Sequence, residues 1–263
     1  GSTWSSETDI NIPTTGQVNV IKTDSRDGSD EGAMIIVDAN SDIYGMRWTG
    51  SAWDNMGVST SWGATASLYY KNPIDVRFEH TSGDIMYAWG YATVGTAHFR
   101  YRTYEQSTST LGSVTNVTNA NNAGVVHWLK LTEDNTSGSD KIMLAVQDAG
   151  TDLNSFQWSG SAWSAVHTEH SSATEDTLNM NFDMAYETHA SNQSDLWLTF
   201  GNGSTVTRKK YESTGTWGTS TTAGDDTAVT KIIAQPNSGA MLAVNYEDNT
   251  SASDDIKDYT STN

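Results

Sequence analysis

The sequence contains no cysteine, only three prolines, and only 14 lysines and arginines against 32 aspartates and glutamates in 263 residues. Without cysteine, thiol catalysis, disulfide bonds and thiolate metal sites are excluded. The formal net charge of −18 argues against nucleic acid as a partner, because phosphate contacts need clustered lysine and arginine. No apolar run approaches the roughly 20 residues of a membrane-spanning helix, so we expect no insertion into a membrane.

The polar residues that are abundant are serine, threonine, asparagine, aspartate and glycine, whereas lysine and glutamate are scarce. Long helices favour lysine, glutamate, leucine and alanine, so this composition argues against a helical protein. An acidic, cysteine-free surface is typical of a secreted or cell-surface protein. The chain begins at Gly1 without an apolar signal segment, and we expect a processed protein or an excised part of one.

One short motif recurs along the chain: an aromatic residue, a turn of glycine, serine and threonine, then tryptophan or leucine. This pattern predicts a β-hairpin. The two plainest copies are WTGSAW and WSGSAW, and the fifth copy is split between the two ends of the chain. The copies cover residues 48–53, 104–111, 158–163, 211–217, and 259–263 joined to 1–4.

The spacing of these hairpins divides the chain into five nearly equal units. The residues that end the hairpin motifs are spaced 49, 58, 52 and 54 residues apart: Trp4, Trp53, Leu111, Trp163 and Trp217. The predicted units are 5–53, 54–111, 112–163, 164–217, and 218–263 with 1–4. A repeat split between the termini has no reason to occur in a linear array, but it closes a ring.

Each unit also contains two short apolar or alternating segments before its hairpin. The first segments are residues 19–23, 75–80, 127–131, 182–187 and 231–235. The second segments, which are continuously apolar and typical of buried strands, are residues 34–37, 85–89, 142–146, 196–200 and 241–244. We therefore predict one all-β domain over residues 1–263: a five-bladed β-propeller with four antiparallel strands per blade, closed by pairing the N-terminal strand with the C-terminal blade. An irregular β-sandwich or a solenoid is the alternative.

The hairpins resemble the repeats of sialidase-like propellers with Asp-boxes and of tachylectin-like propellers. An Asp-box reads roughly Ser-x-Asp-x-Gly-x-Thr-Trp, and residues 215–217 and 1–4 match only its tail. The aspartate is missing from every copy and the glycine is displaced. The resemblance therefore implies the fold and no particular activity.

Aromatic residues are the first candidates for ligand binding. Those of the hairpins recur in nearly every unit, so we expect them to pack between blades, with stacking against sugars as the alternative. Four tryptophans that do not recur in register are better candidates for ligand binding: Trp62, Trp89, Trp128 and Trp197. Trp62, in the loop 59–63, is expected to be exposed, whereas the other three lie in strand patterns where a core position is the alternative.

Acidic loops are candidates for calcium, which takes roughly six to eight oxygen ligands. The candidate ligands are Asp24, Asp27, Asp30, Asp248 and Asp254. None of the loops has the spacing of an EF-hand, and a solvated acidic turn is the alternative. A second, weaker metal candidate is the loop that carries His167, Glu169 and His170.

A glycoside hydrolase needs two carboxylates about 5–9.5 Å apart across the scissile bond. The candidates on the predicted innermost strands are Asp75, Glu79, Asp183 and Glu187. Each pair is four residues apart, which places both members on one face of a strand. Arg77 is the only arginine on a predicted innermost strand, which argues against a sialidase.

We expect a non-catalytic extracellular propeller that binds a glycan or a surface protein through loops or clefts between blades, as a monomer or as part of a larger protein. Two alternatives remain at this stage. One is a five-bladed glycoside hydrolase with a carboxylate pair in the central channel. The other is a structural or adhesive module of a larger surface protein.

Overall fold

Every regular element that the structure describes is a β-strand. The structure is a computed structural model, which describes residues 7, 9–14, 16–65, 71–91, 98–118, 124–171, 173, 180–188, 194–202, 205–224, 230–234, 241–246 and 256–261. No helix able to cross a membrane occurs among these residues. The all-β prediction is confirmed.

The described strands form five antiparallel sheets, numbered I to V in chain order. Sheet I consists of β1 (Val18–Ser25), β2 (Gly32–Asp38), β3 (Ile43–Trp48) and β4 (Trp53–Asp54). Sheet II consists of β5 (Ile74–Phe78), β6 (Ile85–Gly90), β7 (Phe99–Glu105), β8 (Thr110–Leu111) and β9 (Thr115–Val117). Sheet III consists of β10 (Val126–Glu133), β11 (Ile142–Asp148), β12 (Leu153–Trp158) and β13 (His167–His170).

Sheets IV and V follow the same meander. Sheet IV consists of β14 (Phe182–Tyr186), β15 (Leu196–Asn202), β16 (Thr205–Glu212), β17 (Thr216–Trp217) and β18 (Thr221–Gly224). Sheet V has three described strands, β19 (Thr230–Ala234), β20 (Met241–Tyr246) and β21 (Ile256–Ser261). In every sheet the strands pair in chain order, except that β9 pairs with β7 and β18 pairs with β16.

The repeated hairpins form as the sequence predicts. Trp48 pairs with Trp53, Tyr104 with Leu111, and Tyr211 with Trp217, and a β-bridge joins Trp158 to Trp163. Three of the turns contain a glycine at a φ of 91–93°, a conformation that other residues rarely adopt. These glycines are Gly50, Gly160 and Gly215.

The apolar strands occupy the interior of the molecule. All residues of β6 and β11 are buried, as are nearly all of β2 and β15. A strand that is buried on both faces reads as a continuous apolar run, because neighbouring sheets cover it from both sides. The predicted positions of these strands are confirmed.

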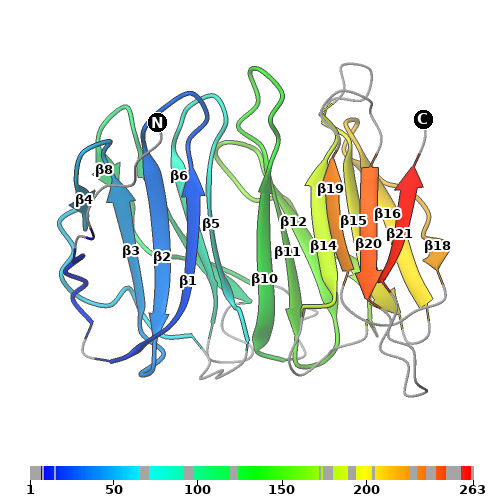
Figure 1. The fold of residues 1–263 in the computed structure, drawn as a ribbon, viewed down its shortest axis with the longest axis horizontal. Coiled ribbons are helices and arrows are strands. Elements are labelled where there is room, and N and C mark those ends of the chain that lie inside the picture. The colour runs from blue at the N-terminus through cyan, green and yellow to red at the C-terminus, as the bar shows by residue number, and fades with distance from the viewer. Residues whose placement is uncertain are drawn as a thin grey trace.

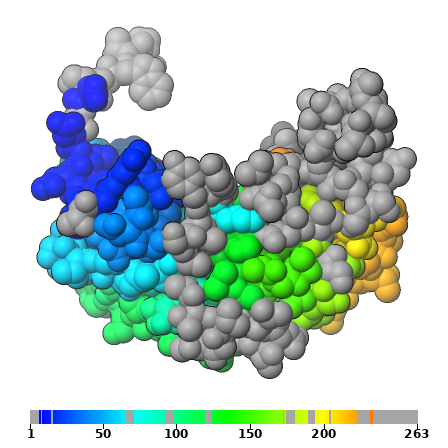
Figure 2. Space-filling view, turned by 90° about the horizontal axis from the view of Figure 1, so that it is seen from below, coloured from blue at the N-terminus to red at the C-terminus, as the bar shows by residue number. Residues whose placement is uncertain are grey.

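The sheets follow one another in chain order from β1 to β21 (Figure 1) and, seen along the strands, sheets I to IV lie on an arc (Figure 2). The first strand of each sheet contacts the first strand of the next, which makes β1, β5, β10, β14 and β19 the innermost strands. Lys22 of β1 and Lys231 of β19 line one central cavity of about 290 Å³. Four-stranded sheets stacked around an axis are the architecture of a β-propeller. The pairing predicted for Trp4 lies outside the described residues.

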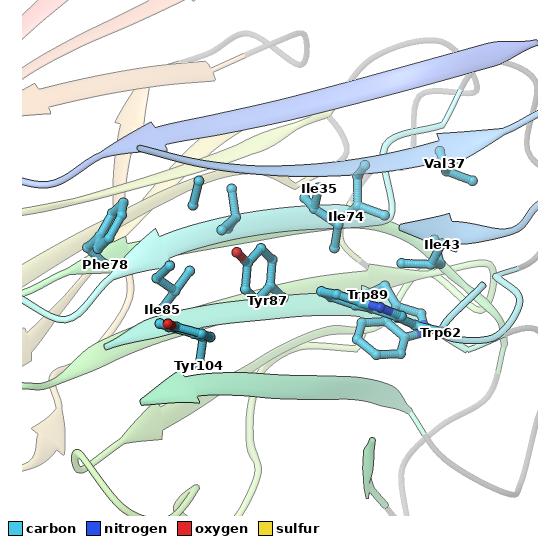
Figure 3. Packing of buried hydrophobic residues seen from close by; sticks show 12 residues of the cluster. Ile35, Val37, Ile43, Trp62, Ile74, Phe78, Ile85, Tyr87, Trp89 and Tyr104 are labelled. Atoms are coloured by element: carbon cyan, nitrogen blue, oxygen red, sulfur yellow. The ribbon is translucent and has the colours of Figure 1, made fainter. Parts of the chain in front are cut away.

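The core between sheets I and II buries Trp62, which the sequence analysis expected to be exposed. Its side chain is packed against Tyr87, with ring centroids 5.1 Å apart, and against Trp89 at 6.1 Å (Figure 3). The backbone of the loop is fixed to β3, because Trp62 N donates to Ile43 O at 2.8 Å. Gly45 leaves the space for the ring, since a Cβ there would overlap it. The expectation of an exposed Trp62 is therefore wrong.

Candidate functional site

In sheets II, III and IV, an aromatic residue of the hairpin contacts the third strand of the preceding sheet. Arg47 of β3 donates from Nη1 to the hydroxyl of Tyr104 at 2.6 Å, and its guanidinium lies 4.5 Å from the centre of that ring. One boundary further on, the rings of Tyr101 and Trp158 are 5.6 Å apart. The expected packing between blades is thus present at both boundaries.

At the boundary of sheets II and III, aromatic rings fill the space beside the hairpin. Phe99 and Trp163 are 5.3 Å apart, and Tyr101 lies 6.0 Å from Trp163. At the boundary of sheets I and II, Met56, Val58 and Leu111 pack against the buried core. At both boundaries, packed side chains thus occupy space beside the hairpin.

The boundary of sheets III and IV contains an open cleft of about 440 Å³. We call it the III–IV cleft. Its lining residues come from β11, β12, β13, the loop between β12 and β13, and the β16–β17 hairpin: Met143, Ser155, Phe156, Gln157, Ser164, Ala165, Val166, His167, Tyr211, Gly215, Thr216 and Trp217. A concave site that combines aromatic residues with a few polar groups is the usual form of a small-molecule site.

One wall of the III–IV cleft is aromatic. Tyr211 and Trp217 pair across the β16–β17 hairpin, with ring centroids 5.1 Å apart and planes tilted by 60°. The indole of Trp217 is half-buried, and the imidazole of His167 lies 6.0 Å from it. The wall therefore offers the apolar surface of aromatic rings to a ligand in the cleft.

The opposite wall is polar, and a buried ion pair supports it. Gln157 accepts a hydrogen bond from the hydroxyl of Tyr211 at 3.2 Å, which joins the two walls. Behind them, the fully buried carboxylate of Glu169 accepts from Lys209 Nζ at 2.9 Å and from the hydroxyl of Ser155, and it contacts His167 Nδ1 at 3.0 Å. These fixed partners orient Ser155 and His167 before any ligand binds.

Strand alternation explains how the polar wall arises. Successive side chains of β13 point to opposite faces, so His167 and Glu169 share one face and His170 lies on the other. Burial, and then the charge of Lys209, lower the pKa of His170, whose ring lies 5.6 Å from Phe200. The three residues therefore do not converge on a metal, and the described part of the chain holds no group of three metal-ligating side chains.

Two of the candidate catalytic carboxylates tie neighbouring sheets together. Asp75 accepts from the backbone N–H of Leu131 at 2.8 Å, and Asp183 accepts from that of Ile232 at 3.1 Å. Asp24 makes the same kind of bond, accepting from Phe78 N at 2.9 Å. All three bonds run from the innermost strand of one sheet to that of the next. Asp75 and Asp183 lie on innermost strands, as the sequence predicted. In the structure, their hydrogen bonds join neighbouring sheets.

The other two candidates follow their strands and contact tryptophans. Glu79 accepts from Trp158 Nε1 at 2.6 Å and from Ser82, and burial raises the pKa of Glu79 to about 7. Glu187 accepts from Trp197 Nε1 and lies 3.7 Å from Lys210 Nζ. Each of these carboxylates already has protein partners.

The tryptophans proposed from the sequence lie mostly in the core. Trp89 is fully buried and Trp128 is 4% exposed. Trp197 is half-buried, with Arg208 and Lys210 each 5.7 Å from its ring centroid. With Trp62 also buried, the structure does not bring these four side chains to one surface, and none of them lines the III–IV cleft.

The proposed calcium ligands of the first acidic loop do not converge. Asp24 accepts a hydrogen bond from Phe78 N and forms an ion pair with Arg77, whereas Asp27 and Asp30 are exposed. Asp248 and Asp254 lie outside the described residues.

The sequence analysis did not select Gln157, considered His167 only as a metal ligand, and gave the hairpin aromatics Tyr211 and Trp217 stacking against sugars only as the alternative to packing. Two signals pointed to them separately: the hairpin motif, which contains Tyr211 and Trp217, and the polar loop, which contains His167. Their meeting across two sheets depends on the stacking of blades, which neither pattern records.

No protein-family model and no curated protein matches this sequence. Solved structures do resemble it. A variant of AofleA from Arthrobotrys oligospora with three arginines replaced by alanine is 9% identical, with a TM-score of 0.57 over 98% of this chain and 74% of that one. The Aleuria aurantia lectin in complex with α-methyl-L-fucoside is 14% identical, with a TM-score of 0.52 over 92% and 76%.

Two further similar structures come from bacteria. A lectin from Burkholderia pseudomallei is 9% identical, with a TM-score of 0.59 over 87% of this chain and 63% of that one. The NanB sialidase from Streptococcus pneumoniae is 11% identical, with a TM-score of 0.50 over 83% and 36%. At these identities the likeness concerns the fold alone. The chain has the all-β propeller architecture of lectins and sialidase-like proteins, as its hairpins predicted.

Proposed function

We propose that this protein is a non-catalytic, extracellular carbohydrate-binding propeller that takes a saccharide into the III–IV cleft. The observation that carries the proposal is the pairing of an aromatic wall with a polar wall in an open cleft, at a position that packed side chains fill at the two preceding boundaries. The lectins among the similar structures support it at the level of the fold.

The chemistry of the cleft suits a sugar. One face of a pyranose presents C–H groups, which pack on an indole ring such as that of Trp217. The hydroxyl groups at the rim of the sugar need partners in fixed positions. Gln157 and His167 supply an amide and an imidazole within the lining, and Tyr211 holds Gln157 in place. A saccharide in this orientation would bury its apolar face and satisfy its hydroxyl groups.

The proposed ring has five blades, with residues 1–4 completing the fifth blade beside β21. One feature supports this closure: the innermost strands of sheets I and V line one cavity. A glycoside hydrolase remains the competing function. The contacts of Asp75, Glu79, Asp183 and Glu187 with backbone and tryptophan groups favour binding without catalysis.

A glycan array with the wild-type protein and the Trp217→Ala variant tests the proposal. The matched control is Trp53→Ala, which removes the equivalent hairpin tryptophan of sheet I and changes only a separate opening of about 440 Å³ beside the β1–β2 turn. We expect binding by the wild type and the control, and a loss of at least about tenfold in affinity, or about 1.4 kcal/mol, in Trp217→Ala. Equal binding by all three proteins would reject the III–IV cleft. An array without any bound glycan would favour a structural module.

A further inference from the structure

The central cavity differs in charge from the rest of the molecule. Its lining comes from the innermost strands of sheets I, II, III and V and from two residues outside them: Ile21, Lys22, Thr23, Asn72, Asp75, Arg77, Leu129, Lys130, Met180 and Lys231. Four of these ten residues are cationic and one is a carboxylate, whereas the whole chain has 14 cationic residues and 32 carboxylates. Among the lining residues cations therefore outnumber carboxylates, and three further carboxylates, Asp24, Glu133 and Asp183, lie beside these cations.

The four cations are not equally committed to protein partners. Arg77 lies 3.1 Å from Asp24 and 3.2 Å from Glu133, so two carboxylates surround it. Lys130 forms an ion pair with the buried Asp183. Lys231 is 4.0 Å from the same carboxylate and its side chain is 57% exposed, while Lys22 makes no ion pair with any residue of the described part of the chain.

The carboxylates near the cavity are fixed by the backbone. Asp75 accepts from Val76 N through one oxygen and from Leu131 N through the other. Asp183 accepts from Met184 N and Ile232 N in addition to its ion pair with Lys130. These hydrogen bonds hold the two carboxylates in the wall, where Lys231 lies 4.0 Å from Asp183 and Lys22 pairs with no carboxylate of the described residues.

The neighbouring lysines also affect the pKa of Lys231. Burial lowers the pKa of Lys231, and the charges of Lys130 and Lys22 lower it further, against the opposing effect of Asp183. The ammonium group of Lys231 therefore lies close enough to those of Lys130 and Lys22, on two other sheets, to be repelled by both. An anion placed among them would relieve this repulsion and would gain a charge-assisted hydrogen bond from each lysine.

We propose that the central cavity is a second binding site, which takes the carboxylate or sulfate group of a small ligand, such as an acidic monosaccharide, through Lys22, Lys130 and Lys231. Its volume of about 290 Å³ is near the lower end of ligand pockets, as a single sugar requires. Because the strong negative charge elsewhere on the chain repels anions, an anion is expected to bind at this group of lysines and not at other parts of the surface. This proposal does not depend on the III–IV cleft.

Titration calorimetry with the full chain tests the site, with D-glucuronate, D-glucose and inorganic sulfate as probes. The variants are Lys22→Gln and Lys231→Gln, since neither lysine has a close ion pair in the described structure. Lys141→Gln serves as the control, because Lys141 does not line the cavity. We expect glucuronate to bind, glucose not to bind at this site, and each cavity variant to weaken binding of glucuronate about tenfold or more.

The comparison of probes identifies the source of the anion. Glucuronate binding more tightly than sulfate assigns the site to an acidic sugar, and equal binding assigns it to a free anion. Trp217→Ala should retain glucuronate binding, which separates this site from the cleft. The proposal is overturned if neither anion binds to the wild type, or if Lys22→Gln and Lys231→Gln bind them as Lys141→Gln does.

Discussion

Replacing Glu79 by glutamine is expected to reduce the dependence of stability on pH. The carboxyl group of Glu79 lies between sheets II and III, where it accepts hydrogen bonds from Trp158 Nε1 at 2.6 Å and from Ser82 Oγ at 2.8 Å. Glutamine has the same shape and can still accept from Trp158. The substitution therefore removes the titration and keeps the packing.

The magnitude follows from the pKa. Burial raises the pKa of Glu79 from 4.5 to about 7, and the charges of Asp140 and Asp84 raise it further, while its two hydrogen bonds oppose the rise. The folded state thus holds the proton more tightly than the unfolded chain does. The resulting stabilisation is fully present below pH 4.5 and is lost as the pH rises through about 7. At about 1.4 kcal/mol per pH unit, the loss amounts to roughly 3 kcal/mol.

Urea unfolding at about pH 4.5 and about pH 8 measures the effect. The other carboxylates titrate in both proteins, so they cancel when the two free energies of unfolding are compared. When the pH rises from about 4.5 to about 8, we expect the free energy of unfolding of the wild type to fall by roughly 2–3 kcal/mol more than that of Glu79→Gln. Glu212→Gln, which removes an exposed carboxylate, controls for the change in net charge. Parallel losses of stability in the wild type and in Glu79→Gln would refute the reasoning.

Two further predictions concern the packing and the closure of the ring. Gly45→Ala should lower the free energy of unfolding by about 1–3 kcal/mol, because the added Cβ overlaps the ring of Trp62. The control Gly218→Ala should change it little, because the atom nearest to the added Cβ is 3.5 Å away. Urea midpoints that move equally in the two variants would contradict the packing. Deleting residues 1–4 should lower the melting temperature by several degrees, because the proposed closure pairs them with sheet V. An unchanged melting curve would reject that closure.

The sequence predicted the strands and hairpins well because both patterns are local. A run such as residues 142–146 is apolar because neighbouring sheets cover both of its faces, and the hairpin at Trp158 and Trp163 needs only its own turn glycine. The same local patterns could not place Trp62. Its burial depends on the space above Gly45 and on hydrogen bonds to β3, which involve residues 17 to 19 positions away.

The carboxylates show the same limit. Asp75 and Asp183 were placed on the correct strands, but their partners Leu131 and Ile232 belong to the next sheet. These contacts depend on the register between sheets, and a single sequence does not encode that register as a pattern. A carboxylate on an innermost strand was therefore equally compatible with catalysis and with the joining of blades.

The III–IV cleft shows which part of a repeat determines whether the space beside its hairpin is filled or open. Trp163 and Trp217 occupy equivalent hairpin positions. Aromatic rings enclose Trp163, whereas Trp217 lines an open cleft. The difference lies in the preceding sheet. Three residues before the hairpin aromatic, β7 has Tyr101, whose ring fills the boundary of sheets II and III, whereas β12 has Ser155, which leaves space and bonds to Glu169. In this chain, the small polar residue on the third strand, rather than the recurring tryptophan, thus distinguishes the boundary with the open cleft from the packed one.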